Sequence, residues 1–271
     1  MFSVLMSIYK NDSPDEFEDS FNSLLKQGSY ISQFVLVCDG PIGDALDDKV
    51  LDFISKAKSQ KIMFDCIRLE TNQGLGKALS IGQTYCSKDY VVRMDSDDIS
   101  LQNRFVELVN YIKKYPETDV IGAQIEEFSV VPGDLGNIRK VPLLHNDIFK
   151  YSKIRNPMNH VTVCIKKSSL ENCGGYEDVL WHEDYYLWVK MLQKGFKFAN
   201  LPNTHVAVRV KGIGDRRTGS KYFKAELNFL NYKYSNYHFS LYDKTKYLLP
   251  RIFFRFMPSS LTGFMYRWLR S

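Results

Sequence analysis

The chain has 271 residues and a formal net charge of +5, with 44% hydrophobic and 14% aromatic residues, so it is expected to fold as one large globular domain or a domain with an appendage. Its five cysteines are widely spaced and form no CxxC pair, which argues against a disulfide framework or a zinc cluster and favours a reducing cytosol. The N-terminus lacks the pattern of a signal peptide, and no stretch reaches the roughly 18 apolar residues of a membrane span.

Strand and helix patterns alternate in the first part of the chain. Residues 3–9 read as a buried strand, and residues 13–28 read as a helix that opens with a Ser13-x-x-Glu16 capping box and Pro14. Further strands are predicted at 34–39, 62–69 and 90–95, separated by helices around 46–58 and from residue 75 onward. This repeated order predicts an α/β fold with a mainly parallel central sheet flanked by helices.

Polar residues gather where each predicted strand ends. In an open parallel sheet these carboxyl ends line one crevice, and ligands bind in that crevice. The sequence therefore predicts a ligand site built from the residues that follow the four strands, namely Tyr9, Asn11 and Asp12, then Asp39, then Asn72, Gly74 and Lys77, and finally Asp95.

The fourth strand is followed by three aspartates within four positions, Asp95, Asp97 and Asp98. Like charges this close raise one another's pKa, so a compensating positive charge is expected. An Asp-x-Asp arrangement offers hard oxygen ligands to Mg²⁺ or Mn²⁺, so the predicted charge is a divalent metal. Helix capping by "DDIS" ahead of "LQNRFVELVNYIKKY" is the structural alternative for one or two of the carboxylates.

Six segments, in order over about residues 3–215, resemble the family-two glycosyltransferases: "SVLMSIYKND", "VLVCDGP", "NQGLGKALSIG", "MDSDD", "NPMNHVTVCIKKSSLENCGGYED" and "WHEDYYLWVKMLQKG". Each segment alone is weak, but six in this order make chance unlikely. The resemblance implies the GT-A nucleotide-diphosphosugar transferase fold. Within the family the chain is most similar to bacterial exopolysaccharide, capsule and lipopolysaccharide enzymes of the amylovoran-biosynthesis type.

The resemblance implies a donor side that binds a nucleotide sugar, with UDP favoured over GDP or dTDP by analogy at Asp39. Tyr9 would lie by the nucleobase, Asp39 would accept from the uracil N–H, and Asn72 and Lys77 would face the diphosphate near a helix N-terminus. The structural alternatives are a core aromatic for Tyr9, a turn former for Asp39 and an exposed helix lysine for Lys77.

The resemblance also implies the metal ligands and the catalytic base. Asp97 would hold Mn²⁺ or Mg²⁺ directly, Asp95 would hold the ribose or a metal-bound water, and Asp98 would support them or cap a helix. Asp184 would take the proton of the acceptor hydroxyl in an inverting transfer, with Glu183 as the second candidate. Because both residues fall at a helix start, they could instead only complement the helix dipole.

On the acceptor side, Asn159 and His160 are candidates to hydrogen-bond sugar hydroxyls, although His160 is not expected to be the catalyst. Relatives often show Tyr-Arg-x-His near the end of the domain, where this chain has Arg209 and then Lys211 in place of the histidine. That departure leaves open whether a protein ligand beyond the aspartates holds the metal, and Lys211 or Arg216 could contact phosphate instead.

The tail differs in charge from the rest of the chain. Residues 221–271 hold nine Lys and Arg against two acidic residues, a net +7, which leaves −2 for residues 1–220. Residues 1–220 are predicted to be the GT-A domain, and 221–271 a helical extension rich in aromatic and basic residues. Such a segment suits an anionic membrane surface, and the alternative is a helical pair that packs on the catalytic domain or on a second subunit.

Three classes of function compete for these features. A sugar nucleotidyltransferase would need a glycine-rich basic loop after the first strand, where "SIYKNDSPDE" is acidic, and a nucleic-acid binder would leave the aspartates unused. The prediction is therefore a metal-dependent inverting glycosyltransferase that moves a sugar to a glycan or polyprenol-linked glycan in surface polysaccharide biosynthesis. It is expected in the bacterial cytoplasm at the inner face of the plasma membrane, with oligomerisation and a non-catalytic sugar-binding role left open.

Overall fold

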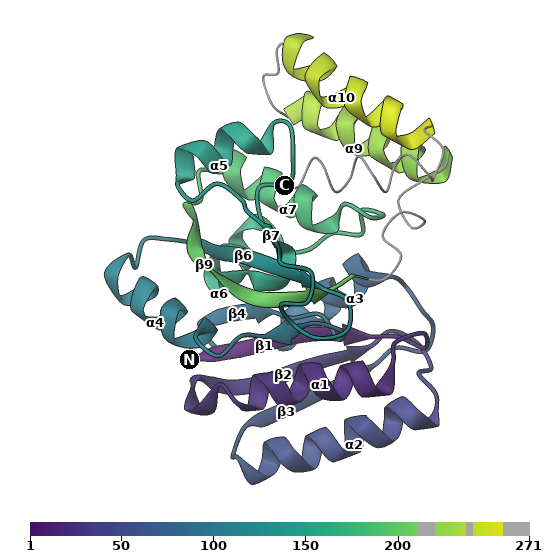
Figure 1. The fold of residues 1–271 in the computed structure, drawn as a ribbon, viewed down its shortest axis with the longest axis vertical. Coiled ribbons are helices and arrows are strands. Elements are labelled where there is room, and N and C mark those ends of the chain that lie inside the picture. The colour runs from purple at the N-terminus through teal and green to yellow at the C-terminus, as the bar shows by residue number, and fades with distance from the viewer. Residues whose placement is uncertain (211–219, 237–240, 257–271) are drawn as a thin grey trace.

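A computed structural model describes residues 1–210, 220–236 and 241–256 of the chain (Figure 1). The first part alternates strands and helices as the sequence predicts. Its elements are β1 (Phe2–Ile8), α1 (Pro14–Leu25), the short helix η1 (Gly28–Tyr30), β2 (Ile31–Cys38), α2 (Asp44–Ser59), β3 (Met63–Arg68), α3 (Leu75–Gly82), η2 (Gln83–Tyr85) and β4 (Tyr90–Arg93).

The second part is less regular. Its elements are β5 (Ile99–Ser100), α4 (Arg104–Lys114), β6 (Val120–Phe128), β7 (Asn137–Arg139), α5 (His145–Ser152), η3 (His160–Thr162), β8 (Cys164–Lys166), α6 (Lys167–Cys173), α7 (Glu183–Gln193), β9 (Phe198–Arg209), α9 (Ser220–Asn236) and α10 (Leu241–Phe256). No helix among residues 1–210, 220–236 and 241–256 is long and apolar enough to cross a membrane.

The strands form one sheet in the order β3-β2-β1-β4-β8-β6-β9-β5, with β7 paired to β6. Strands β1 to β4 are parallel, which confirms the predicted arrangement of the first part. Beyond β4 the sheet is mixed, because β8 runs antiparallel to both β4 and β6, whereas β9 runs parallel to β6. The α/β fold is therefore confirmed, and the second half adds antiparallel pairs to the parallel core.

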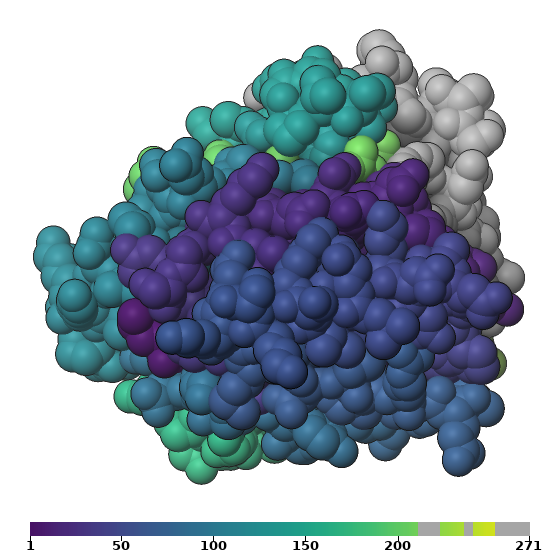
Figure 2. All heavy atoms as spheres, turned by 90° about the horizontal axis from the view of Figure 1, so that it is seen from below, coloured from purple at the N-terminus to yellow at the C-terminus, as the bar shows by residue number. Residues whose placement is uncertain are grey.

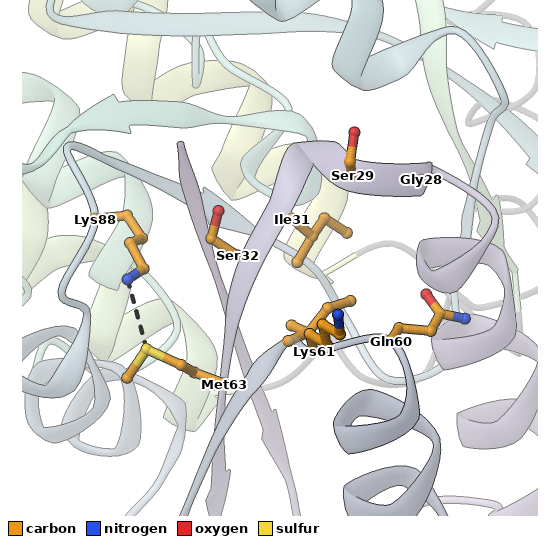
Figure 3. A pocket seen from close by; sticks show the side chains of 9 residues that line it. Gly28, Ser29, Ile31, Ser32, Gln60, Lys61, Met63 and Lys88 are labelled. Atoms are coloured by element: carbon orange, nitrogen blue, oxygen red, sulfur yellow. Dashed lines mark hydrogen bonds between the residues drawn. The ribbon is translucent and has the colours of Figure 1, made fainter.

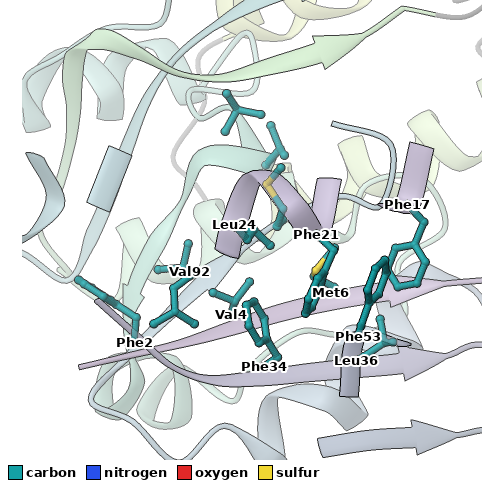
Figure 4. Packing of buried hydrophobic residues seen from close by; sticks show 14 of the residues in the cluster. Phe2, Val4, Met6, Phe17, Phe21, Leu24, Phe34, Leu36, Phe53 and Val92 are labelled. Carbon is teal, nitrogen blue, oxygen red and sulfur yellow. The ribbon is translucent and has the colours of Figure 1, made fainter. Parts of the chain in front are cut away.

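Hydrophobic layers cover both faces of the sheet. On β1, Val4, Met6 and Ile8 join one buried cluster and Leu5 joins the other, because successive side chains of a strand point to opposite faces. Figure 4 shows the first cluster, in which rings of α1 and α2 pack over β1 and β2. Helices α3, α6 and α7 supply the second cluster. Viewed from below, α2 forms part of the outer surface (Figure 2).

The start of α1 follows its predicted capping pattern. The Ser13 hydroxyl accepts a hydrogen bond from the Glu16 N–H at 3.5 Å, and Pro14 is the first helical residue. By contrast, α4 begins at Arg104 and its N-cap, Asn103, makes no side-chain capping bond. The aspartates of "MDSDD" therefore do not cap α4, and the capping alternative for them is wrong.

Helices α9 and α10 lie beside each other and against α7 at one end of the molecule (Figure 1). A third apolar cluster joins them, with buried Phe229, Leu230 and Tyr247 packed on Tyr185 and Val189 of α7. The described part of the predicted extension thus packs on the rest of the chain. This agrees with the alternative in which the tail is a helical pair packed on the catalytic domain.

Candidate active site

The carboxyl ends of β1, β2 and β3 meet at one edge of the sheet, as the parallel order requires. A hollow of about 450 Å³ opens there, lined by Lys10, Asp39, Gly40, Pro41, Glu70, Thr71 and Asn72. Tyr9, at the end of β1, is partly buried and is not among the lining residues. Its neighbour Lys10 lines the hollow instead, so the contact of Tyr9 with a nucleobase stays a prediction.

Asp39 is a buried carboxylate at the end of β2, only 4% exposed. Its two oxygens accept hydrogen bonds from the N–H groups of Gln73 (2.7 Å) and Gly74 (2.9 Å), which ties the loop before α3 to β2. Carboxylate oxygens have further lone pairs, so Asp39 can also accept from a ligand in the hollow. Gly40 follows with a φ of +85°, and a Cβ there would lie 2.7 Å from the Asn72 nitrogen, so the close approach of the two loops requires glycine.

The loop after β3 presents the two predicted diphosphate residues to solvent. Asn72 is exposed and donates from Nδ2 to the Asp39 carbonyl at 3.2 Å. Lys77 is exposed on α3, whose N-terminus follows Gly74. Asn72 lines the hollow and Lys77 lies in the first turn of α3, where the backbone N–H groups of a helix start attract anions, so their contact with a diphosphate stays a prediction.

The turn that carries the aspartates is fixed from three sides. The Ser96 hydroxyl donates to Asp12 (3.0 Å) after β1, and the Ser20 hydroxyl of α1 donates to the Asp95 carbonyl (2.8 Å). Asp98 is buried, and its carboxylate accepts from the Arg209 N–H of β9 at 2.9 Å. Burial first, and then the charges of Asp95 and Asp97, raise the pKa of Asp98 well above its usual range.

The structure supplies a positive charge that the sequence interpretation missed. Arg93, the last residue of β4, is 2% exposed, and its guanidinium forms an ion pair with Asp95. It also donates to the Met94 carbonyl. The assignment of charge compensation to a metal alone was therefore incomplete, because a buried arginine neutralises Asp95. Arg209 donates from Nε to the Asp97 carbonyl at 3.2 Å, and its guanidinium forms ion pairs with Glu16 and Asp19 of α1.

The aspartate turn offers carboxylate oxygens that suit a divalent metal. Asp95 is about two-fifths exposed and Asp97 is partly exposed, so both carboxylates can offer oxygens to a ligand. Within the described ranges no three His, Cys, Asp or Glu side chains are grouped to hold a metal by themselves. Two carboxylates suit Mg²⁺ or Mn²⁺ that completes its coordination with phosphate oxygens and water. The residues fit such a metal.

The acidic turn of α7 carries the two predicted catalytic carboxylates. Asp184 accepts from Asn156 Nδ2 (2.6 Å) on one oxygen and from the Tyr185 N–H (2.6 Å) on the other, which fixes its orientation. Glu183 is largely buried, and its burial followed by the charge of Asp184 raises its pKa to about 7. A carboxyl with such a pKa can exchange a proton near neutral pH.

The acidic turn of α7 lies beside the start of α3 and within electrostatic reach of the aspartate turn. A Cβ on Gly76 would lie 3.2 Å from the Glu183 Cβ, so α3 passes directly beside α7. The charges of Arg93 and Asp95 also act on the pKa of Glu183, the arginine lowering it and the aspartate raising it. Glu183, beside Asp184, is therefore within electrostatic reach of Asp95 from a distant part of the chain.

The two predicted acceptor residues, Asn159 and His160, form hydrogen bonds within the protein. Asn159 is 1% exposed and donates to the Ala123 carbonyl at 2.8 Å, so its predicted bond to a sugar hydroxyl is wrong for this conformation. His160 pairs through Nε2 with the Tyr176 hydroxyl at 2.9 Å, and burial lowers its pKa to about 4. It is therefore a neutral, structural histidine, consistent with the expectation that it is not the catalyst. Lys211 and Arg216 lie outside the described residues.

A second hollow, of about 580 Å³, lies at the opposite end of the strands (Figure 3). It is lined by residues that begin β2 and β3, including Ile31, Ser32 and Met63, together with Lys61 and Lys88. Lys88 Nζ lies 3.5 Å from the Met63 sulfur. None of the predicted site residues lines this hollow, so the candidate site is at the carboxyl ends.

Of two site residues that the sequence interpretation missed, Arg93 and Asn156, only Arg93 could have been found from the sequence. Arg93 is the one charged residue in the apolar stretch "YVVRM" and lies two positions before Asp95, a spacing that places both on one side of a strand. Asn156 stands at the head of "NPMNHVTVC", but nothing in its spacing indicates a partner 28 residues further on.

Comparison with known proteins decides the family. The model of glycosyl transferase family 2 matches residues 3–180. The chain belongs to this family. It is 41% identical over 86% of its length to a glycosyltransferase of Haemophilus influenzae, of which it covers 85%. It is also 33% identical to the amylovoran biosynthesis glycosyltransferase AmsE of Erwinia amylovora, with 98% of each chain covered.

A third relative of this glycosyltransferase is the UDP-Gal:alpha-D-GlcNAc-diphosphoundecaprenol beta-1,3-galactosyltransferase of Escherichia coli, 36% identical over 98% of this chain and 95% of the relative. Among solved structures, TarS from S. aureus in complex with UDP-GlcNAc matches with a TM-score of 0.67 and 16% identity, over 97% of this chain and 74% of TarS. The mannosyltransferase PcManGT, solved with GDP-Man and Mn²⁺, matches with a TM-score of 0.59 and 12% identity, over 99% of this chain and 79% of PcManGT. These structural matches confirm the predicted GT-A fold.

Proposed function

We propose that this glycosyltransferase moves a sugar from a UDP-sugar to a hydroxyl of a lipid-linked glycan, with inversion at the anomeric carbon, during synthesis of a surface polysaccharide. The observation that carries the proposal is the meeting of two acidic turns. The Asp95–Asp98 turn follows β4, which is parallel to β1, and the charge of Asp95 acts on Glu183 in the second acidic turn, so we expect a donor phosphate and a proton acceptor to share one site.

On the donor side, Asp39 accepts from the uracil ring and the hollow beside it receives the base. Tyr9 lies alongside the base, while Asn72 and Lys77 hold the diphosphate at the start of α3. Asp95 holds the ribose or a metal-bound water. The base-edge contact at Asp39 favours UDP, and UDP-sugars are the donors named for the E. coli relative and bound in TarS.

On the acceptor side, Asp184 takes the proton as the acceptor hydroxyl attacks the anomeric carbon opposite the departing UDP. Asn156 holds one Asp184 oxygen in place at 2.6 Å. Attack from the opposite side without a covalent intermediate inverts the carbon. A β linkage made from an α-linked UDP-sugar is such an inversion, and the E. coli relative is named for a beta-1,3 product. Glu183, with its pKa near 7, is the second candidate for the proton.

Asp97 and Asp95 would hold Mn²⁺ or Mg²⁺, which supplies positive charge to the leaving diphosphate when it is bound. The hard oxygens of the two carboxylates and their exposure toward the crevice support this assignment. Arg93 keeps Asp95 in place through their ion pair, independently of the metal.

The proposal is tested by a transfer assay with the full chain. UDP-hexoses and UDP-N-acetylhexosamines are each incubated with a GlcNAc-diphosphate-lipid acceptor and Mn²⁺, and products are read by mass spectrometry. We expect one donor to give a glycosylated lipid and free UDP. If UDP binds tightly but no donor in the panel gives a product, the chain is a sugar-nucleotide-binding relative and the proposal is wrong.

We also propose that α10, within the extension 221–271, contacts an anionic membrane surface and holds the enzyme at the inner face of the bacterial plasma membrane. Exposed apolar residues of α10 support this: Leu241 (77% exposed), Tyr242 (69%) and Leu249 (63%). Lys246 is exposed among them. Apolar and basic side chains together match the headgroup region of acidic lipids.

Replacing Tyr242 and Leu249 together by Ser is expected to reduce co-sedimentation with vesicles of phosphatidylglycerol and phosphatidylcholine several-fold, because the exposed apolar area is lost. Binding of the unchanged protein should weaken as salt rises. Leu51→Ser is the matched control, since Leu51 is 61% exposed on α2. Deleting α10 is a poorer test because Tyr247 is buried against α7 and α9. Equal sedimentation of the double variant and the control would count against this surface.

A further inference from the structure

Helix α9 packs on the turn that carries Glu183 and Asp184, through the residues on either side of them. The His182 ring stacks on Phe229 at 4.9 Å, and the Tyr186 ring stacks on Tyr232 at 4.0 Å. Tyr185, directly after Asp184, packs its ring on Phe229 at 4.8 Å. Three residues of the first turn of α7 or its cap therefore rest on one face of α9.

Lys233 of α9 joins this turn to a second segment. Its buried Nζ donates to the Tyr185 hydroxyl (2.7 Å) and to the carbonyls of Ser152 and Lys153 (both 3.0 Å). The Tyr185 hydroxyl in turn donates to the Ser152 carbonyl at 2.7 Å. The end of α5 and the start of α7 are therefore connected through one ammonium group.

The two segments that Lys233 joins are the ones that supply the Asn156–Asp184 hydrogen bond. Asn156 follows Lys153 by three residues, and Asp184 precedes Tyr185. Arg251 of α10 holds the same stretch from the other side, because its Nη2 donates to the Ile154 carbonyl at 2.9 Å. The positions of Asn156 and Asp184 thus depend on the contacts that Lys233 and Arg251 make with the end of α5 and the start of α7.

The surroundings of Lys233 suit a charged amine. An ammonium has three N–H groups, and the structure offers three acceptors. Its Nζ also lies 4.4 Å from the Tyr185 ring centre, 4.5 Å from that of Tyr247 and 5.6 Å from that of Phe229. Aromatic faces attract cations. These contacts oppose burial and the charge of Arg251, which both lower the pKa of Lys233.

We infer that Lys233 is a positioning residue for sugar transfer, which holds Asn156 and Asp184 at their hydrogen-bonding distance by tying the end of α5 to the first turn of α7. The inference rests on the proposed role of Asp184. It makes α9 a functional part of the transferase unit.

The test compares Lys233→Met with Lys113→Met, the same change at an exposed position of α4. Lys233→Met keeps an apolar stem but loses all three hydrogen bonds, so kcat is expected to fall about 10-fold or more. UDP affinity should stay within about twofold of the unchanged protein, because Lys233 donates to the end of α5 and the first turn of α7, whereas the nucleotide is expected at β2 and the loop before α3. Lys113→Met should match the unchanged protein in both.

A double variant separates positioning from general stability. If Lys233 acts through the Asn156–Asp184 pair, Asn156→Ala and the double variant Asn156→Ala/Lys233→Met should lose kcat by similar factors. Multiplicative losses would overturn the inference, as would an unchanged kcat in Lys233→Met. Should Lys233→Met fail to fold, Tyr185→Phe removes one hydroxyl of the same network and is expected to lower kcat by a smaller factor, while an unchanged kcat there contradicts the inference.

A measurement that needs no transfer keeps this inference separate from the proposed function. Amide hydrogen exchange of the peptide over residues 183–187 should be faster in Lys233→Met than in Lys113→Met, while exchange over α3 stays the same. Unchanged exchange at 183–187 would overturn the inference even if the wild-type chain transferred no sugar. Faster exchange in a chain that transfers no sugar would support the role of Lys233 in holding α5 and α7 together, and it would refute the proposed function.

Discussion

Replacing Asp184 by Asn is expected to lower sugar transfer by about 10²-fold or more, while UDP and metal affinities remain close to those of the unchanged protein. An amide can occupy the same place beside Asn156, but it cannot take the acceptor proton. Steady-state transfer rates and calorimetry of UDP with Mn²⁺ measure the two quantities. The proposed nucleotide contacts lie on β2 and the loop before α3, which Asp39 ties together, so they should be unaffected.

The matched variant is Glu183→Gln, one residue away in the same turn. If Asp184 is the base, Glu183→Gln should retain most of the activity and lose only the pH dependence that comes from the raised pKa of Glu183 near 7. If Asp184 only caps the start of α7, Asn is nearly as good a capping residue, and sugar transfer should survive. Near-normal transfer by Asp184→Asn with a large loss in Glu183→Gln would move the base to Glu183.

Replacing Asp97 by Ala is expected to abolish metal-dependent binding of UDP-sugars and to leave the fold intact. Asp97 is partly exposed at the crevice, so its removal leaves no large cavity. Thermal shifts measured with UDP-sugars, with and without Mn²⁺, report binding because a ligand of the native state raises its stability. The unchanged protein should show a shift that Mn²⁺ enlarges, and the variant should show no effect of Mn²⁺.

The control for Asp97→Ala is Asp44→Ala, at the exposed start of α2 and outside the crevice. That variant should keep the Mn²⁺-dependent shift. A normal Mn²⁺-dependent affinity for UDP in Asp97→Ala would remove Asp97 from the proposed metal ligands. Loss of the shift in both variants would point to a general effect of lowered acidity.

Local patterns predicted the parallel half of the fold well. Residues of β1 alternate between the two hydrophobic layers. Short stretches of sequence suffice to predict this alternation, the Ser13 cap and the glycines after helices. The crevice at the strand ends followed from the parallel order alone. The predicted positions of Asp39, Asn72 and Asp95 at that edge are where the structure has them.

Pairing between segments far apart in the sequence limited the prediction of the second half of the fold. The second half of the sheet depends on β6, β8 and β9 pairing across long stretches, in parallel and antiparallel registers that no local pattern distinguishes. The bond between Asp98 and the Arg209 N–H spans 111 residues. Likewise, the buried state of Asn159 and the contact of Lys233 with Tyr185 depend on which elements pack together, so the sequence could not show them.

The anomeric configuration of the product tests the central claim most directly. The product formed from an α-linked UDP-sugar and a GlcNAc-diphosphate-lipid acceptor would be isolated, and its new linkage read from the anomeric coupling constant by NMR. A single base, Asp184, facing the acceptor side with no covalent intermediate predicts a β-linked product. An α-linked product would show retention and would contradict the mechanism proposed for these two acidic turns.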